Sequence, residues 1–295
     1  MTRLDTLLAG RDWLLADGAT GTNLFAMGLE AGEAPELWNE AEPAKIRALY
    51  DGAVGAGSDI FLTNSFGGNR SRLKLHEAEA RAFDHNRSAA EIFEEQARGL
   101  LAGGADVLWV ETISAPDEIR AAALGIARAD APWCCTMSFD TAGRTMMGLT
   151  PAGMAALVAD LPNPPLAFGA NCGVGASDLL RTVLGFEAAH PALPVIAKGN
   201  AGIPKFVGGH IHYDGTPELM ADYAVLARDS GARIIGGCCG TTPDHLRAMR
   251  AALEATPRGP APGLDTIAAR LGAFSSAGDG SGGEAPTRER RRRRG

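Results

Sequence analysis

Two adjacent cysteines lie inside a run of glycines near the carboxyl end of the chain, and a third lies far upstream. The pair is Cys238 and Cys239, in Gly236-Gly237-Cys238-Cys239-Gly240, and the third is Cys172, in Asn171-Cys172-Gly173. Consecutive side chains of a β-strand point to opposite faces, so neighbouring thiols meet at one point only where the backbone leaves the strand. Glycine permits this, because it adopts positive φ without steric cost. Three converging thiols are the protein ligands of a catalytic zinc site whose fourth position is open.

The alternative is a set of buried cysteines that pack as small hydrophobic side chains, which is common. The glycines around the pair, and the separate Asn-Cys-Gly site, favour the zinc interpretation. Directly downstream, Thr242, Pro243 and Asp244 are typical of the N-cap and first turn of a helix. A helix N-terminus that faces the pair would lower the pKa of both thiols and favour the thiolates that metals bind.

Two carboxylates follow apolar runs. Asp17 begins the turn Asp17-Gly18-Ala19-Thr20-Gly21-Thr22, whose backbone N–H groups would suit a bound carboxylate while Asp17 accepts an ammonium group. A tight turn that caps a helix explains the same residues equally well. Glu111 either faces a ligand or lies at the rim of the fold and pairs with a lysine.

Two further groups have competing interpretations. His210 and His212 lie two residues apart and would chelate a metal from one strand face, with Lys198 and Asp214 completing a hydrolase-like set. The glycine-rich surroundings of the two histidines indicate a loop instead. Cys134 and Cys135 lie in an apolar run without flanking glycines, so we predict that they pack in the core.

Short apolar runs that alternate with amphipathic stretches would position these side chains. The expected strands cover Trp13–Asp17, Asp59–Asn64, Asp106–Glu111, Trp133–Ser138, Leu166–Asn171, Pro194–Lys198 and Arg233–Gly236. Helical patterns follow most of them, for example Pro116–Arg128 and Asp178–Ala189. Strands alternating with helices predict a parallel sheet. Polar residues at the carboxyl ends of strands are typical of a (β/α)8 barrel, and also of an open doubly wound sheet.

The seven expected strands are one fewer than a (β/α)8 barrel needs. Between Asn64 and Asp106 the pattern is almost unbroken helix, roughly Asn69 to Leu101, so one strand and part of its crossover are missing there. We assign residues 1–274 to the barrel. Residues 275–295 are rich in Ser and Gly and then in Arg, and we predict a disordered tail.

Charge and cysteine content exclude several classes of protein. The chain of 295 residues has a net charge of −7, and removing the +5 carried by its last eight residues leaves −12, a poor surface for nucleic acid. Five cysteines, an odd number, do not indicate a disulfide framework. Neither a signal peptide nor an apolar run of about 20 residues is visible. We therefore expect a reduced, cytoplasmic protein with no nucleic-acid or membrane partner.

Six motifs, in order, resemble the homocysteine S-methyltransferase family. That family includes betaine–homocysteine methyltransferases and the homocysteine-binding module of cobalamin-dependent methionine synthase. The motifs are Asp17–Thr22, Thr63-Asn64-Ser65-Phe66-Gly67, Glu111-Thr112-Ile113, Asn171-Cys172-Gly173, Asn200-Ala201-Gly202-Ile203-Pro204 and Gly236–Pro243. The similarity covers roughly residues 12 to 255 and is greater to the methionine synthase module.

The resemblance implies a (β/α)8 TIM barrel in which Zn²⁺ is the cofactor. It also implies that zinc is held by Cys172, Cys238 and Cys239. The amino group of homocysteine would be bound by Asp17 and Glu111. Its carboxylate would be bound by backbone amides around Gly18, Ala19 and Thr20. No catalytic group beyond the zinc ligands is implied. The activity would be transfer of a methyl group to the homocysteine thiolate, which gives methionine.

The chain departs from the family pattern in two places. A strand and loop that family members carry is absent between residues 86 and 96, where the strand count falls short. Gly67 and Thr112 stand where betaine-type members would have aromatic residues, which weakens the case for betaine. The methyl donor would be a methylcorrinoid partner protein or a small onium compound such as glycine betaine. The alternatives are a metal-dependent barrel hydrolase that uses His210 and His212, and a zinc-stabilised homologue without activity.

Overall fold

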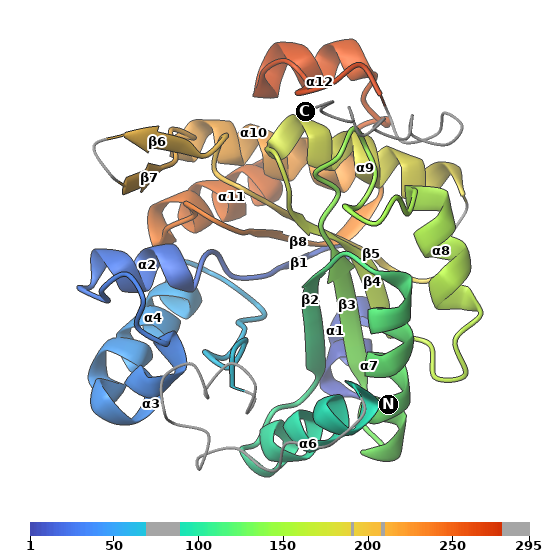
Figure 1. The fold of residues 1–295 in the computed structure, drawn as a ribbon. Coiled ribbons are helices and arrows are strands. Elements are labelled where there is room, and N and C mark those ends of the chain that lie inside the picture. Colours follow the sequence, from blue (N-terminus) through green and yellow to red (C-terminus); the bar gives the residue numbers. More distant parts are fainter. Residues whose placement is uncertain (69–88, 190–191, 208–209, 279–295) are drawn as a thin grey trace, which may run out of the picture.

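The computed structural model in Figure 1 describes residues 1–68, 89–189, 192–207 and 210–278. Six parallel strands form one sheet in the order β1-β8-β5-β4-β3-β2. They are β1 (Leu14–Leu15), β2 (Leu108–Ile113), β3 (Trp133–Met137), β4 (Ala167–Cys172), β5 (Val195–Gly199) and β8 (Ala232–Gly237). Every pairing in this sheet is parallel. The expected βα alternation is therefore confirmed, and six of the seven expected strands form.

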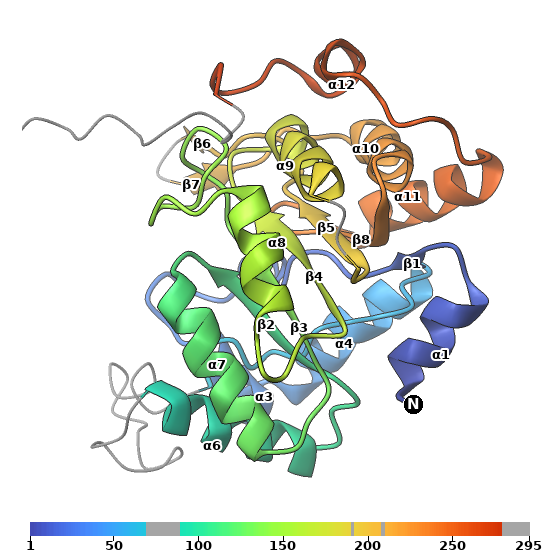
Figure 2. The same cartoon turned by 90° about the vertical axis from the view of Figure 1, so that its right-hand side faces the viewer.

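Helices connect the strands, and most of them cover the outer side of the sheet, whereas Leu4 of the first helix packs with Cys134 on the opposite face. The helices are α1 (Arg3–Gly10), α2 (Gly21–Ala26), α3 (Trp38–Ala41), α4 (Pro43–Gly55), α6 (Ala89–Ala102), α7 (Pro116–Arg128), α8 (Pro151–Ala159), α9 (Ala176–Ala188), α10 (Pro217–Asp229), α11 (Pro243–Ala255) and α12 (Leu264–Leu271), with a 3-10 turn over Pro35–Leu37. In Figure 2, α9 packs on β4 and β5, α10 on β8 and α7 on β2. Helix α11 begins as predicted, with Thr242 as the N-cap and Pro243 in its first turn.

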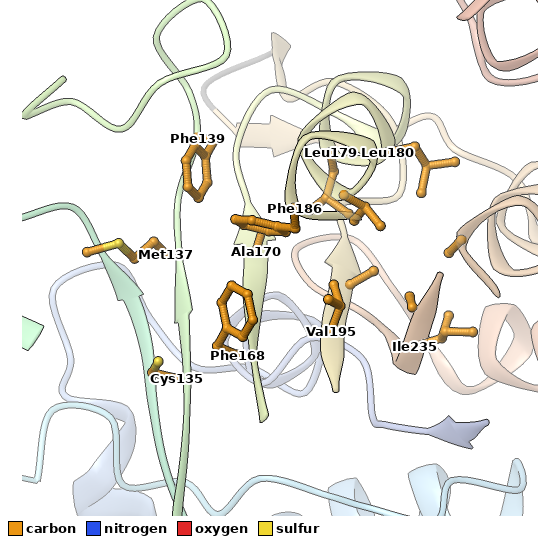
Figure 3. Close-up of a cluster of buried hydrophobic side chains, with 14 of the residues drawn as sticks. Cys135, Met137, Phe139, Phe168, Ala170, Leu179, Leu180, Phe186, Val195 and Ile235 are labelled. Atoms are coloured by element: carbon orange, nitrogen blue, oxygen red, sulfur yellow. The ribbon is translucent and has the colours of Figure 1, made fainter. Parts of the chain in front are cut away.

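The main core lies between the sheet and these helices. Figure 3 shows Phe168 of β4 beneath Phe186 of α9, and the two rings meet edge to face with their centroids 5.2 Å apart. Phe139 contacts Phe186 in the same manner from the other side, at 5.6 Å. Cys134 and Cys135 are fully buried on opposite faces of β3, in two separate hydrophobic clusters. The prediction that these two cysteines are packing residues is confirmed.

The sheet does not close into a complete barrel. The expected strand Asp59–Asn64 forms only one bridge, from Ile60 to Ala16 beside β1. At the other end, no described residue pairs with the outer edge of β2. Helix α6 begins at Ala89 and runs through the interval where the missing unit was predicted. The backbone N–H of Leu62 donates to the carboxylate of Asp17 and not to a backbone carbonyl, so the pairing with β1 does not continue along residues 59–64.

One expected loop is a strand. His210–His212 form β7, which pairs antiparallel with β6 (Lys205–Val207), so the prediction of a loop at the two histidines is wrong. The intervening dipeptide, Gly208-Gly209, is of the type that two-residue hairpin turns favour. Antiparallel strands need no long crossover, which lets this hairpin form outside the main sheet.

The end of the described chain lies against α9. The backbone N–H of Ser275 donates to Asp178, at 2.9 Å, and Arg181 donates to the carbonyl of Ser276, at 2.8 Å. These two serines fall in the predicted tail, of which residues 279–295 lie outside the described residues. The helical prediction for residues 69–88 lies outside them too. In the described part of the chain, no helix has the length and apolar content needed to cross a bilayer.

Candidate metal centre

Three cysteine thiols meet at the carboxyl end of the parallel sheet. Cys172 ends β4, while Cys238 and Cys239 follow β8, and their sulfur atoms all lie within 4.8 Å of one another. The strand register brings them together: Cys172 pairs with Gly199 of β5, which pairs in turn with Gly237 of β8. The predicted convergence of the three cysteines is confirmed.

The backbone turns sharply at both ends of the cluster. Gly173 and Gly240 have positive φ, of 74° and 78°, as expected for glycines that let the chain leave a strand. Cys172 itself has a φ of 62°, a left-handed conformation that costs a non-glycine residue roughly 1–2 kcal/mol. The sequence did not indicate this strain, since no glycine marks the position. Strain of this kind is commonly found where a side chain must point at a ligand.

Hydrogen bonds between the thiols decide which of them ionises first. The pKa of Cys172 is lowered, because Cys238 and Cys239 both hydrogen bond to it. The same contacts with Cys172 raise the pKa of Cys238 and of Cys239. We expected the N-terminus of α11 to lower the pKa of the vicinal pair. That expectation is wrong for the metal-free thiols, because the pKa of both is raised, chiefly by their hydrogen bonds with Cys172.

The dimensions of the cluster suit a zinc ion. Tetrahedral zinc with bonds of about 2.3 Å places its sulfur ligands about 3.8 Å apart. The observed limit of 4.8 Å requires only small side-chain adjustments to reach that spacing. Thiolates are the ligands that zinc prefers, and three of them leave one position for a substrate. The residues present therefore fit a zinc site of the catalytic type.

Asp17 is buried beside the cluster and already has a cationic partner. Its carboxylate accepts a hydrogen bond from Lys198 of β5, at 2.7 Å, and one from the backbone N–H of Leu62, at 2.7 Å. Burial alone would lower the pKa of Lys198, but the charges of Asp17 and Glu111 outweigh it, so the pKa is raised and the group stays an ammonium ion. The sequence placed Lys198 at a strand end without showing this pairing.

Glu111 lies on β2 near the same charges. Burial raises the pKa of Glu111 to about 7, with Cys238 and Asp17 adding to the rise and Lys198 opposing it. The next residue, Thr112, has a φ of 61° and is held by Asn171, which accepts from its N–H at 2.9 Å and donates to its hydroxyl at 2.8 Å. Glu111 therefore lies near the charges of the site, and its role as an acid that faces a ligand stays a prediction.

The glycine turn after β1 packs against the turn that follows the cysteines. A Cβ added to Gly18 would lie 2.7 Å from the carbonyl oxygen of Thr241, so only glycine allows this approach. The backbone N–H of Ala19 donates to that same carbonyl, at 3.2 Å, and is therefore engaged within the fold. Thr20 is the N-cap of the short helix α2. The turn thus lies next to the cluster and leads into α2, as a turn that caps a helix would, while its binding of a carboxylate stays a prediction.

A cavity of about 830 Å³ extends from Glu111 along the open side of the sheet. Residues 59–66 form one wall of it, and β2 with part of α6 forms the other. Its lining is largely apolar and includes Phe61, Phe66, Phe93 and Trp109. The cavity therefore occupies the position of the absent strand and begins at the predicted substrate-binding acid.

Comparison with known proteins identifies the family. The model of the family described as homocysteine S-methyltransferase matches residues 14–94 and 84–253. The chain belongs to the homocysteine S-methyltransferase family. The two matched stretches overlap over residues 84–94, which coincides with most of the interval 86–96 where the sequence predicted a missing βα unit.

Relatives of this homocysteine S-methyltransferase family member include much longer proteins. The methionine synthases of Mycobacterium leprae and Mycobacterium tuberculosis are each 28% identical to it, over 81% of this chain and 24% of theirs. The chain therefore spans about a quarter of the length of these relatives. The metallated form of the homocysteine methyltransferase MmuM from Escherichia coli is similar in fold, with a TM-score of 0.65 at 23% identity, covering 84% of this chain and 99% of that one.

The hydrolase-like set does not assemble in this family member. Lys198 is buried with Asp17, whereas Asp214 is exposed and pairs with Lys205. His212 is exposed, and the side chain of His210 lies outside the described residues. Among the described residues, the three cysteines are the only group of three or more metal-ligating side chains that gathers closely enough to hold an ion.

Proposed function

We propose that this protein is a zinc-dependent homocysteine S-methyltransferase, which transfers a methyl group to the homocysteine thiolate and forms methionine. The observation that carries the proposal is the convergence of Cys172, Cys238 and Cys239 within 4.8 Å in a chain of this family. Two comparisons support it: a similar fold has been solved in a metallated form, and the mycobacterial relatives are methionine synthases.

Zinc bound by the three cysteines would offer its fourth position to the substrate sulfur and keep that sulfur deprotonated near neutral pH. The residues of the chain would bind the amino acid end of homocysteine. Glu111 faces the site with a pKa of about 7, and an ammonium group beside it would favour its charged form. Asp17 would complete the amino-group site, with its carboxylate shared between Lys198 and the substrate ammonium group. The turn at Gly18, Ala19 and Thr20 would receive the carboxylate through the backbone N–H groups of Gly18 and Thr20, since that of Ala19 already donates to Thr241.

The reaction at the methyl group needs positioning more than acid–base chemistry. The homocysteine sulfur forms a bond to the methyl carbon, and the bond from that carbon to the donor breaks with its electron pair left on the donor. No proton moves at the methyl centre, so the contribution of the protein is to hold sulfur and methyl carbon in line. The buried contacts of Asp17 and Asn171 provide a rigid frame for this alignment.

Two donor classes fit the opening beside Glu111. The aromatic rings of Phe61 and Phe66 line the cavity of about 830 Å³ and would attract a small onium compound, because the faces of aromatic rings bind cations. The same open side of the sheet would give a methylcorrinoid, carried by a partner protein, a route to the cysteines. Homocysteine is the common acceptor in both cases.

The decisive experiment measures zinc content and methionine formation together. The purified protein is loaded with zinc and supplied with homocysteine and, in separate reactions, methylcobalamin, glycine betaine and S-methylmethionine. We expect about one zinc per chain and methionine from at least one donor, with both lost in Cys239→Ser. A variant that keeps its metal would show that Cys239 is not a ligand and would overturn the proposed site. A protein that binds zinc, yields no methionine, and unfolds when Cys239 is replaced would be a scaffold.

A further inference from the structure

The site holds an ammonium group of the protein next to the acid that would bind the substrate ammonium group. The Nζ atom of Lys198 lies 2.7 Å from one carboxylate oxygen of Asp17, and the two side chains are only 3% and 8% exposed. The other carboxylate oxygen of Asp17 accepts from the backbone N–H of Leu62, at 2.7 Å. Both oxygens of this carboxylate therefore have a donor from the chain itself before any substrate binds.

Lys198 is held in this position by its backbone and by an aromatic ring. Its backbone lies inside the sheet, where it pairs with Asn171 of β4 on one side and with Gly236 of β8 on the other. The ammonium group lies over the ring of Trp109 from β2, with Nζ 5.5 Å from the ring centroid. The face of an aromatic ring attracts a cation. The ammonium group of Lys198 is therefore a fixed part of the site.

The Asp17–Lys198 pair lies beside the cysteine-bearing turn after β8. The carbonyl oxygen of Asp17 accepts from the backbone N–H of Gly237, at 3.0 Å, and Gly237 directly precedes Cys238. In homocysteine, three carbon atoms separate the sulfur from the amino group. A substrate whose sulfur occupies the open position of the metal would therefore bring its amino group within reach of Asp17. The substrate ammonium group and Lys198 would then meet at the same carboxylate.

A second cation at Asp17 binds less favourably than a first one. The carboxylate carries a single negative charge, which Lys198 already balances, and two neighbouring ammonium groups repel each other. Two unit charges about 5 Å apart, at an effective dielectric constant of about 20 to 40, repel by an energy equivalent to about a ten- to hundredfold loss of affinity. Glu111, whose charge also acts on Lys198, is left as the main counter-ion for a substrate ammonium group.

We propose that Lys198 is a specificity-determining residue, which takes the place of the substrate ammonium group beside Asp17 and so weakens the selection of homocysteine over thiols without an amino group. The inference rests on the proposed function, which places the substrate sulfur on the metal and its amino group near Asp17. The class of acceptor that benefits is a thiol that carries a carboxylate and no amino group, because it leaves the Asp17–Lys198 pair undisturbed.

The test measures the binding of two thiols to the zinc-loaded protein by titration calorimetry. One is homocysteine, and the other is γ-mercaptobutyrate, which is homocysteine without its amino group. The dissociation constant of γ-mercaptobutyrate divided by that of homocysteine gives the selection for the amino group. We expect Lys198→Met to raise this ratio about ten- to hundredfold, because the substrate ammonium group then supplies the cation that Asp17 lacks. Lys205→Met removes an exposed lysine that pairs with Asp214, and as the matched control it should leave the ratio unchanged.

A second variant makes the test independent of the stability of Lys198→Met. If Lys198 occupies Asp17, the amino group is selected by Glu111, and Glu111→Gln should bring the ratio of the two dissociation constants close to unity. If Asp17 binds the substrate ammonium group in spite of Lys198, most of the selection should remain in Glu111→Gln. This variant decides the question if Lys198→Met does not fold.

Two results would overturn the inference. One is a ratio in folded Lys198→Met that is no higher than in the wild type, and the other is a ratio in Glu111→Gln that equals the wild-type ratio. Methionine formation by the wild-type protein is measured in parallel. Active wild-type protein with either of these binding results refutes the role of Lys198 alone, whereas the expected ratios without methionine from any donor refute only the proposed activity. Binding of neither thiol would refute both.

Discussion

Replacing Glu111 by glutamine should make the protein more stable at pH 8 and less able to bind homocysteine. Glu111 has a pKa of about 7 in the folded protein against an ordinary value of 4.5, chiefly because of its burial. The groups that act on it are Lys198 on β5, which opposes the rise, and Cys238 after β8 and Asp17 after β1, which add to it. Glutamine keeps the shape of the side chain and removes its charge.

The sign and size of the effect follow from proton linkage. The folded state holds the Glu111 proton more tightly than the unfolded state, so ionisation opposes folding. This penalty is absent below about pH 4.5, grows as the pH rises towards 7, and is complete above 7. A difference of about 2.5 units corresponds to about 3 kcal/mol. Because the side chain is only half-buried, solvent screening reduces this to about 1–2 kcal/mol.

The assay is urea denaturation at pH 5, 6, 7 and 8, with a chelator and a reductant present so that no metal adds its charge to the site. Glu111→Gln should exceed the wild type in free energy of unfolding by about 1–2 kcal/mol at pH 8, with little difference at pH 5. Glu30→Gln, at an exposed position, is the control and should differ from the wild type equally at every pH. In zinc-loaded protein, Glu111→Gln should raise the KM for homocysteine at least tenfold.

Two observations would refute the reasoning about Glu111. A stability difference that stays constant from pH 5 to pH 8 would mean that the carboxyl titrates normally in the folded state. A variant that is less stable than the wild type at pH 8, by an amount that shrinks as the pH falls, would mean that the charged form stabilises the fold, as a salt bridge with Lys198 would. An unchanged KM would separately remove Glu111 from the amino-group site, whatever its titration.

Three further predictions follow from the structure. Cys172→Ser should abolish stoichiometric zinc binding, so that the rise in melting temperature on adding zinc to metal-free wild type disappears in the variant; a variant that still binds one zinc would contradict the proposed ligand set. Lys198→Met should lower the free energy of unfolding, measured by urea denaturation, by about 3–5 kcal/mol, because it leaves the buried Asp17 carboxylate without its cation. A decrease below about 1 kcal/mol would show that the pair is not needed for stability. Phe186→Ala should lower the free energy of unfolding by about 3–5 kcal/mol by the same method, since the ring fills the space between Phe139 and Phe168. A decrease near zero would mean that this core repacks around the vacated space.

Local sequence signals predicted a large part of the fold. The helix expected over Pro116–Arg128 has those bounds, and the strand expected at Trp133–Ser138 forms over Trp133–Met137. Both have their signals within the segment itself: a proline at the first helical position, and a short apolar run that is buried on both faces. The cysteine cluster was predicted for a similar reason, because the glycines that allow its geometry are adjacent in sequence.

The failures have a different physical origin. Asp59–Asn64 has the pattern of a strand but forms one bridge, since a strand depends on neighbours that the sequence of the segment does not specify. Lys198 and Asp17 are 181 residues apart, and their pairing depends on the register of β5 with β8 and of β8 with β1. The positive φ of Cys172 and Thr112 was equally invisible, because neither residue type favours it.

Asn171 explains how the site keeps its geometry although the sheet is open beside it. Strand β2 carries Glu111, and no described residue pairs with its outer edge, so a closed barrel does not fix its carboxyl end. Asn171 reaches from β4 past β3 to bind both the N–H and the hydroxyl of Thr112, and its amide also contacts the sulfur of Cys238. One buried amide thus links the acid-bearing strand to the metal ligands. Because these bonds hold Thr112 in a conformation that costs roughly 1–2 kcal/mol, the position of Glu111 relative to the cysteines is set from inside the sheet and does not require the absent strand.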